Sequence, residues 1–142
     1  MTGNGGVYFQ GVELGDDLPD LCPDVSMAVI RRFTHEAAYM PAPRFIDHEE
    51  ARKEGLPAAI VPGIMSQGLL ATLIHRWCPE AQILRIDTIF RAPVVVDSEP
   101  VCRGVVTDTD AETSRIEIDL TIENEAGETR VLGTALVELP AK

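Results

Sequence analysis

The sequence has few basic residues for its length. Its 142 residues include 12 Lys and Arg against 23 Asp and Glu, and the formal net charge is −11. A surface that binds nucleic-acid phosphates needs clustered Lys and Arg, and anionic membrane surfaces attract the same side chains. The sequence has no such cluster, so we expect neither a nucleic acid nor a membrane among its partners.

Long apolar runs and zinc-binding motifs are also missing. The longest strongly apolar stretch, residues 64–74, is too short to cross a bilayer, and the first residues lack the basic and apolar regions of a secretion signal. The three cysteines are widely spaced and form no Cys-x-x-Cys or Cys/His pattern. We therefore expect a cytoplasmic protein that keeps its thiols free and binds no metal.

The first half of the chain contains signals for helices. Asp24 or Ser26 can cap a helix that starts in SMAVIRRF, and Asp47 can cap the charged segment HEEARKEG. Residues 62–77 start with Pro-Gly and are apolar on almost every side, which is typical of a buried helix. The prolines of MPAPRF, between the first two of these helices, are expected to stop the first one.

The second half of the chain changes to the two-residue period of β-strands. Between Ile116 and Ile122, apolar side chains alternate with polar ones, which predicts a half-buried strand. The segment NEAGET predicts a hairpin turn, and residues 131–139 are apolar on both faces, as in a central strand. The sequence therefore predicts one α+β domain, in which an antiparallel sheet is wrapped around the helix at residues 62–77.

Two segments resemble the MaoC-like, or (R)-specific enoyl-CoA hydratase, branch of the hot-dog fold. One is RRFTHEAAYMPAPRFIDHEEARKEGLPAAIVPGIMSQGLL, similar to a family segment in which Asp-x-Asn-Pro-x-His precedes an acidic helix and a His-Gly pair. The other is ILRIDTIFRAPVVVDSEPVCRGVV, similar to a later strand pair of the family. The resemblance implies a single hot-dog domain over residues 1–142. It also implies a CoA or acyl-carrier-protein thioester as substrate or ligand, with no further cofactor.

The acid–base pair of that family is missing from this chain. In the family, an Asp and a His add water to a trans-2-enoyl thioester or remove it from the 3-hydroxy form. Counting back from Asp47 places the Asp at Met40 and the His at Phe45, whereas counting forward from Phe33 places the Asp at Tyr39. Phe45 can exchange no proton in either register. The resemblance is therefore to a subunit that lacks its own catalytic pair.

His35 and Glu36 are the candidates for a displaced acid–base pair. They fall at the end of the first expected helix, just before the proline-rich stretch. The alternative, which we favour, is that they form an exposed pair on a helix surface. His48 belongs to the charged helix that follows, and we expect it on a solvated face.

The resemblance also assigns binding roles around the start of the long apolar helix. There the backbone N–H groups of Gly63 and Ile64 have no intrahelical partner, and in the family this position holds the thioester carbonyl. Pro-Gly as a plain helix start is an equally good explanation. By the same resemblance, Met40, Phe45, Ile64 and Met65 line an acyl tunnel, with ordinary core packing as the alternative.

Three functions are compatible with this reading. The first is a non-catalytic subunit of an enoyl-CoA hydratase or 3-hydroxyacyl dehydratase, paired with a catalytic hot-dog subunit. The second is a hot-dog thioesterase in which Glu36 or another carboxylate activates water. The third is a homodimer that binds acyl-CoA without chemistry. Since hot-dog dimers join two sheets edge to edge, we expect at least a dimer in each case.

Overall fold

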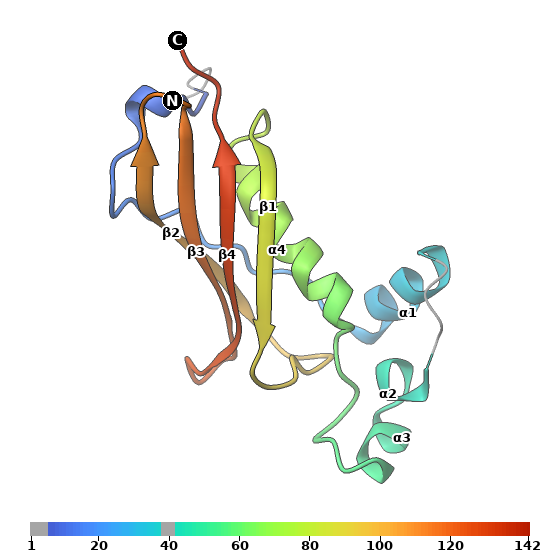
Figure 1. The fold of residues 1–142 in the computed structure, drawn as a ribbon. Coiled ribbons are helices and arrows are strands. Elements are labelled where there is room, and N and C mark those ends of the chain that lie inside the picture. Colours follow the sequence, from blue (N-terminus) through green and yellow to red (C-terminus); the bar gives the residue numbers. More distant parts are fainter. Residues whose placement is uncertain (1–5, 38–41) are drawn as a thin grey trace.

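The computed structural model describes residues 6–37 and 42–142 and contains an antiparallel sheet with helices on one side (Figure 1). The described elements are, in chain order, the 3₁₀ turn η1 (Phe9–Gly11), the helices α1 (Met27–Glu36), α2 (Pro43–Ile46), α3 (His48–Lys53) and α4 (Gly63–Trp77), and the strands β1 (Gln82–Phe90), β2 (Val101–Asp110), β3 (Arg115–Glu123) and β4 (Thr129–Glu138). In this part of the chain, no helix is long and apolar enough to cross a bilayer.

Side-chain caps define the starts of α1 and α3. The hydroxyl of Ser26 accepts a hydrogen bond from the backbone N–H of Val29, and the carboxylate of Asp24 in turn accepts one from the N–H of Ser26. At α3, the carboxylate of Asp47 accepts from the N–H of Glu50 at 3.1 Å. The predicted cap at Asp47 is confirmed, and Ser26 is the residue that caps α1.

The short helix α2 was not expected from the sequence. The first helix does end before the prolines, at Glu36. The structure then places Pro43 in the first turn of a new helix that closes by a hydrogen bond from Asp47 N to Pro43 O. A proline suits this position because its missing N–H would have no intrahelical partner there. As a result Phe45 lies on a helical turn rather than in a loop.

The sheet has the strand order β1-β4-β3-β2, and all neighbouring strands are antiparallel. The inner face of β3 is fully buried at its alternate positions from Ile116 to Ile122, where it forms one core with Leu70, Leu73 and Ile74 of α4. Each such side chain contributes about 1.5–3 kcal/mol by leaving water. The predicted α+β class, the long helix and the central position of β4 are confirmed.

The burial of α4 is one-sided in the single chain. The sheet covers the face that carries its leucines, while Ile64, Gly68 and Thr72, each four residues apart, are exposed on the other side. Ile64 is 58% exposed, which is unusual for an isoleucine in the first turn of a central helix. This stripe is therefore available for contact with something other than the sheet.

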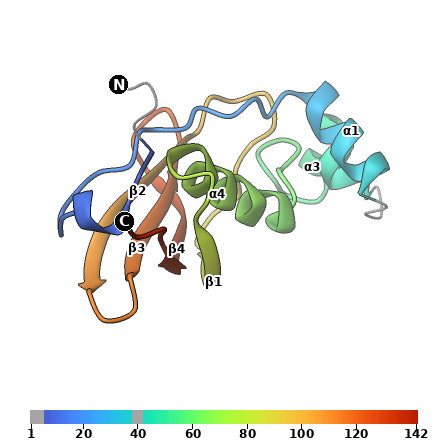
Figure 2. The same cartoon turned by 90° about the horizontal axis from the view of Figure 1, so that it is seen from above.

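The two edges of the sheet differ. Along β2 the N-terminal segment adds an irregular extra strand, with hydrogen bonds from Leu18 N to Gly104 O and from Leu21 N to Cys102 O. Figure 2 shows this segment running from the edge of β2 towards α1. Within the described part of the chain, β1 pairs only with β4, so its outer edge stays open.

Candidate functional site

A pocket of about 320 Å³ opens beside the N-terminus of α4. Its walls are held together by backbone hydrogen bonds between the segment before α4 and the segment after β1, from Val61 N to Val94 O and from Val96 N to Ala59 O, both 2.8 Å. The lining is mostly apolar, and its polar or charged side chains are those of Ser66 and Arg91. No Asp, Glu or His among the described residues lines it.

The start of α4 supplies hydrogen-bond donors at this pocket. The first N–H group to enter the helix ladder is that of Ser66, which donates to Pro62 O at 3.1 Å. The N–H groups of Gly63 and Ile64 precede it, and no acceptor for either lies among the described residues. Gly63 lines the pocket, whereas the side chain of Ile64 points to solvent. The helix dipole favours a partly negative oxygen at such a position.

Ser66 is the site residue that we did not anticipate from the sequence. Its side chain is 2% exposed and lines the pocket, and its hydroxyl has no hydrogen-bond partner in the part of the chain that the structure describes. Leaving a buried hydroxyl without a partner costs about 1–3 kcal/mol. One feature of the sequence could have identified Ser66 as a site residue: it follows Gly63 by three residues and so lies on the same face of the helix.

The predicted tunnel residues do not gather at this pocket in the single chain. Met40, and Tyr39 beside it, lie outside the described residues. Phe45 packs against the core from α2, and Met65 is buried in the core on the sheet side of α4. Ile64 faces solvent. Their roles as tunnel walls remain predictions.

His35 and Glu36 lie on the exposed last turn of α1. The carboxylate of Glu36 accepts a hydrogen bond from the guanidinium of Arg32, one helical turn earlier, at 3.1 Å. Neither residue lines the pocket beside α4. The structure thus places the two as we favoured, on a helix surface.

His48 is only partly solvated, with 28% of its side chain exposed, so that expectation holds in part. Its Nε2 lies 2.7 Å from a carboxylate oxygen of Asp97, and its Nδ1 accepts a hydrogen bond from the N–H of Ala59 at 3.0 Å. The other oxygen of Asp97 accepts from the N–H of Met27, the first residue of α1. Both ring nitrogens are therefore engaged in holding α1, α3 and the loop before β2 together, and neither is free to transfer a proton to a ligand.

These contacts also set the charge state of Asp97. The hydrogen bond from His48, followed by the one from the N–H of Met27, lowers the pKa of Asp97 below its usual value. Desolvation acts in the opposite direction but is the smaller effect. Asp97 is thus an anionic anchor for α1 and α3.

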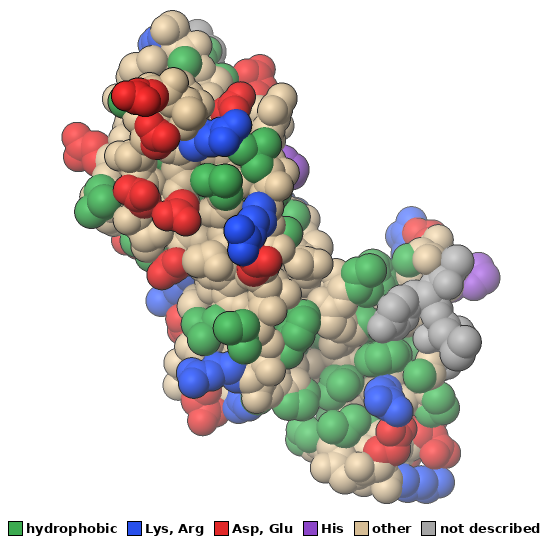
Figure 3. Space-filling view, viewed as in Figure 1, with side chains coloured by type: hydrophobic (Ala, Val, Ile, Leu, Met, Phe, Trp, Pro, Cys, Tyr) green, Lys and Arg blue, Asp and Glu red, His purple; other side chains and the backbone are tan. Residues whose placement is uncertain are grey.

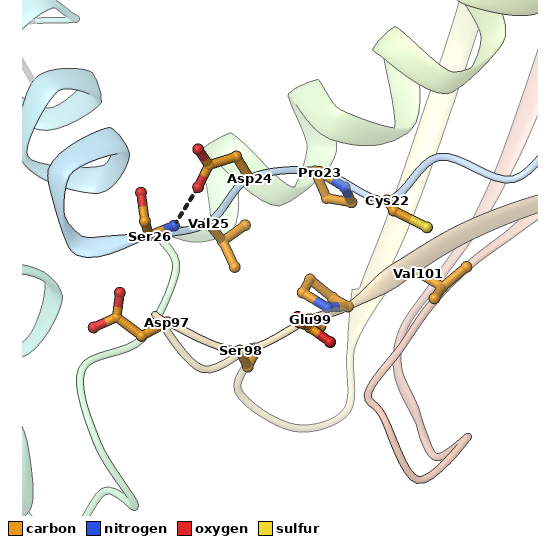
Figure 4. A pocket seen from close by; sticks show the side chains of 10 residues that line it. Cys22, Pro23, Asp24, Val25, Ser26, Asp97, Ser98, Glu99 and Val101 are labelled. Atoms are coloured by element: carbon orange, nitrogen blue, oxygen red, sulfur yellow. Dashed lines mark hydrogen bonds between the residues drawn. The ribbon is translucent and has the colours of Figure 1, made fainter.

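A larger cavity, about 650 Å³, lies between residues 22–26 and 97–101. Figure 4 shows its acidic side chains and the hydrogen bond from Ser26 to Asp24. The carboxylates of Asp24 and Asp97 both serve as hydrogen-bond acceptors for backbone at the start of α1. Within the described ranges, no group of three or more His, Cys, Asp or Glu is arranged to hold a metal ion. This cavity belongs to the junction between the helices and the sheet.

The visible surface carries charges of both signs. Figure 3 shows acidic and basic side chains interspersed over the sheet, whereas apolar side chains gather over the helices α1 to α3. No continuous basic surface appears on this face, in keeping with the net charge of −11. The one cation that lines the pocket beside α4, Arg91, forms no ion pair with another described residue.

The fold is similar to that of several solved structures. The (R)-hydratase from A. caviae involved in PHA biosynthesis superposes with a TM-score of 0.85 at 22% identity, covering 92% of this chain and 99% of that one. The R-hydratase PhaJ1 from Pseudomonas aeruginosa superposes with a TM-score of 0.87 at 18% identity, covering 96% of this chain and 88% of that one. The ChsH1-ChsH2 complex from Mycobacterium tuberculosis superposes with a TM-score of 0.80 at 20% identity, covering 89% of this chain and 98% of that one.

No protein-family model matches the sequence, and no curated protein matches it. The structural neighbours are (R)-hydratases and MaoC-like dehydratases, and the chain has their hot-dog fold. At these identities the likeness establishes the fold, and the chemistry has to be argued from the residues of this chain.

Proposed function

We propose that the chain is a thioester-binding, MaoC-like subunit of an enoyl-CoA hydratase or 3-hydroxyacyl dehydratase and lacks its own acid–base pair. One observation carries this proposal. The pocket at the N-terminus of α4 offers hydrogen-bond donors, but none of its described lining residues is an Asp, Glu or His. Donors suffice to bind a carbonyl oxygen, whereas hydration needs a positioned acid or base, typically worth about 10²–10⁴ in rate.

In this proposal the thioester carbonyl binds at the start of α4. The N–H groups of Gly63 and Ile64 have no acceptor among the described residues and lie at the positive end of the helix dipole. Gly63 carries no side chain, so a ligand atom can approach its backbone closely. The same donors stabilise the negative charge that a carbonyl oxygen gains when a catalytic partner moves a proton nearby.

The acyl chain is proposed to run along Phe45, Ile64 and Met65, with Met40 completing the wall. Ile64 is 58% exposed in the single chain, so this tunnel needs a second surface to close it. Neither Phe45 nor Met40 can donate or accept a proton in hydration. Apolar side chains at these positions suit contact with the hydrocarbon part of an acyl group.

The open edge of β1 is the proposed place for that second surface. Three apolar side chains on this strand are exposed: Leu84, Ile89 and Phe90. An unpaired strand edge with apolar side chains is a site for association, because pairing satisfies its backbone groups. One structural neighbour is a complex of two different chains, ChsH1 and ChsH2. We propose a hot-dog partner, either a second copy or a subunit that supplies the missing Asp and His.

A thioesterase is less well supported, because Glu36 is paired with Arg32 on an exposed turn and does not line the pocket. The two functions separate in one experiment with the purified chain. Crotonyl-CoA is added, binding is followed by calorimetry, and released CoA is measured with a thiol reagent. The proposal predicts binding without release of free CoA. Steady release of CoA would establish the thioesterase instead, and absence of binding would contradict the proposal.

A further inference from the structure

We propose that the hydroxyl of Ser66 donates a hydrogen bond to the carbonyl oxygen of the bound acyl thioester and thereby determines the affinity of the pocket for thioesters. The inference rests on the proposed function, because it takes an acyl thioester as the ligand. It adds a side-chain donor, located one helical turn into α4, to the backbone donors at Gly63 and Ile64.

The first argument is the contrast with two other helical hydroxyls. Thr34 Oγ1 donates to Arg31 O, and Thr72 Oγ1 donates to Gly68 O, each at 2.9 Å. Both thus bond back to their own helix, the usual arrangement for a hydroxyl within a helix. Ser66 is 2% exposed and makes no such bond, and its hydroxyl finds no partner anywhere in the described part of the chain. A buried donor of this kind is explained when a ligand accepts from it.

Ser66 and Gly63 lie next to each other at the pocket beside α4. Ser66 follows Gly63 by three residues, so the two lie on the same face of α4, and both line the pocket of about 320 Å³. A single acceptor atom near the start of α4 can therefore take a bond from the Gly63 N–H and from the Ser66 hydroxyl. The carbonyl oxygen of a thioester has two lone pairs and meets this requirement. A purely apolar ligand would leave both donors unsatisfied.

Ser66 is not placed to act as a nucleophile. A serine acts as a nucleophile when an adjacent base removes its proton. None of the described residues that line this pocket is an Asp, Glu or His, so none of them can act as that base. The charged lining residue, Arg91, is exposed at the rim. Ser66 is accordingly a hydrogen-bond donor in binding, and no covalent acyl intermediate is proposed.

The test compares two ligands that differ only in the carbonyl group. Butyryl-CoA has the thioester carbonyl, and S-butyl-CoA has a methylene group in its place. Calorimetry on the full chain should show that butyryl-CoA binds about tenfold more tightly than S-butyl-CoA. In Ser66→Ala and in Ser66→Cys most of this preference should be lost, while S-butyl-CoA binds as before. The matched control, Thr72→Ala, removes an exposed hydroxyl on the same helix and should keep the preference.

A stability measurement gives a readout that a purely structural role would not produce. Because the hydroxyl is unsatisfied in the free protein, Ser66→Ala should leave the Tm of the free protein unchanged or raise it. A clear fall in that Tm would overturn the inference, as would an undiminished preference for butyryl-CoA in both variants. In those cases the proposed function still stands if the unmodified chain binds butyryl-CoA. If the unmodified chain binds neither ligand, the proposed function fails, and the inference fails with it.

Discussion

Phe90 lies directly against Gly63: a Cβ atom added to Gly63 would be 3.3 Å from Cζ of the Phe90 ring. Phe90 is the last residue of β1, and its side chain remains 54% exposed. The contact joins the start of α4 to the end of the open edge strand. In the proposed function these are the places where the ligand and the partner subunit meet.

Gly63→Ala should weaken thioester binding about tenfold or more while changing stability little. The new methyl group would lie closer to the Phe90 ring than a normal van der Waals contact. It would also occupy space beside the N–H donors. The exposed ring can shift, and alanine is the better helix former, so the effects on stability offset one another. Calorimetry with butyryl-CoA and thermal unfolding of the same samples measure the two quantities.

Gly68→Ala is the matched control for that substitution. No atom lies within 4 Å of a Cβ built on Gly68, which occupies an exposed position in the same helix. The change should raise stability by up to about 1 kcal/mol and leave ligand affinity unaltered. Equal losses of affinity in both variants would place the thioester elsewhere.

The open edge of β1 predicts a dimer that one charge can disrupt. Ile89 is 65% exposed on this strand, and Ile89→Lys should convert the dimer to monomers, because an edge lysine opposes strand pairing. Leu14 is 68% exposed, and its neighbour Gly15 bonds to Val106 of β2, the strand at the opposite edge of the sheet. Leu14→Lys therefore adds the same charge as a control and should leave the dimer intact. Sedimentation at micromolar concentration distinguishes the outcomes, and a monomeric unmodified chain would contradict the proposed interface.

The bond between His48 and Asp97 predicts a pH-dependent contribution to stability. The pKa of Asp97 is lower in the folded chain than its usual value. This stabilisation is therefore present above the usual aspartate pKa and is lost as the pH falls through the lowered folded pKa. The Tm deficit of His48→Ala should be present above the usual aspartate pKa of about 3.9 and should shrink as the solution becomes more acidic than that.

His35→Ala provides the comparison, because His35 is exposed on α1 and lines neither the pocket nor the Asp97 cluster. Its Tm difference from the unmodified chain should be small at every pH. If the deficit of His48→Ala is independent of pH, the hydrogen bond to Asp97 contributes nothing and His48 acts through packing alone.

The cysteines differ in accessibility, which predicts selective labelling. Burial raises the pKa of Cys102 to about 12, and burial also raises that of Cys78, whereas Cys22 is exposed. At about pH 8.5 iodoacetamide should modify Cys22 rapidly and the other two only after unfolding, because the thiolate is the reactive form. Mass spectrometry after brief labelling checks this, with Cys22→Ser as the control. Rapid modification of Cys102 in the folded chain would contradict the packing of β2.

The raised pKa of Cys102 has a consequence at alkaline pH. Its folded value lies above that of an unfolded cysteine, about 8.5. The buried thiol therefore costs no stability below about pH 8.5, and the fold loses stability as the pH rises towards 12. Cys102→Ala should flatten this alkaline decline in Tm, whereas Cys22→Ser should not.

The elements with strong local signals could be predicted from the sequence. Pro62 and Gly63 start α4 where expected, and the alternation from Ile116 to Ile122 places β3 correctly. Local spacing determines both features, so no knowledge of the tertiary structure was required. Pro43 was read as an end to helical structure, although proline is equally suited to begin a turn of helix.

The polar contacts could not be predicted in this way. His48 meets Asp97 across 49 positions of sequence, and neither residue has a local signal for the other. Ser66 looked like an ordinary helical serine, because an unsatisfied hydroxyl becomes visible only when every possible partner has been placed. The one-sided burial of α4 could not be predicted either. An apolar helix predicts contact on all sides, but its sequence does not say whether the same chain or another chain provides each contact.

We predict that this chain binds enoyl thioesters without hydrating them. The most direct test is the hydration of crotonyl-CoA by the purified chain alone, measured by loss of the enoyl absorbance at concentrations where calorimetry shows the thioester bound. The account predicts saturable binding and a hydration rate at least about 10²-fold below ordinary enzymatic values of about 1–10³ per second. Hydration by the isolated chain within that ordinary range would contradict it.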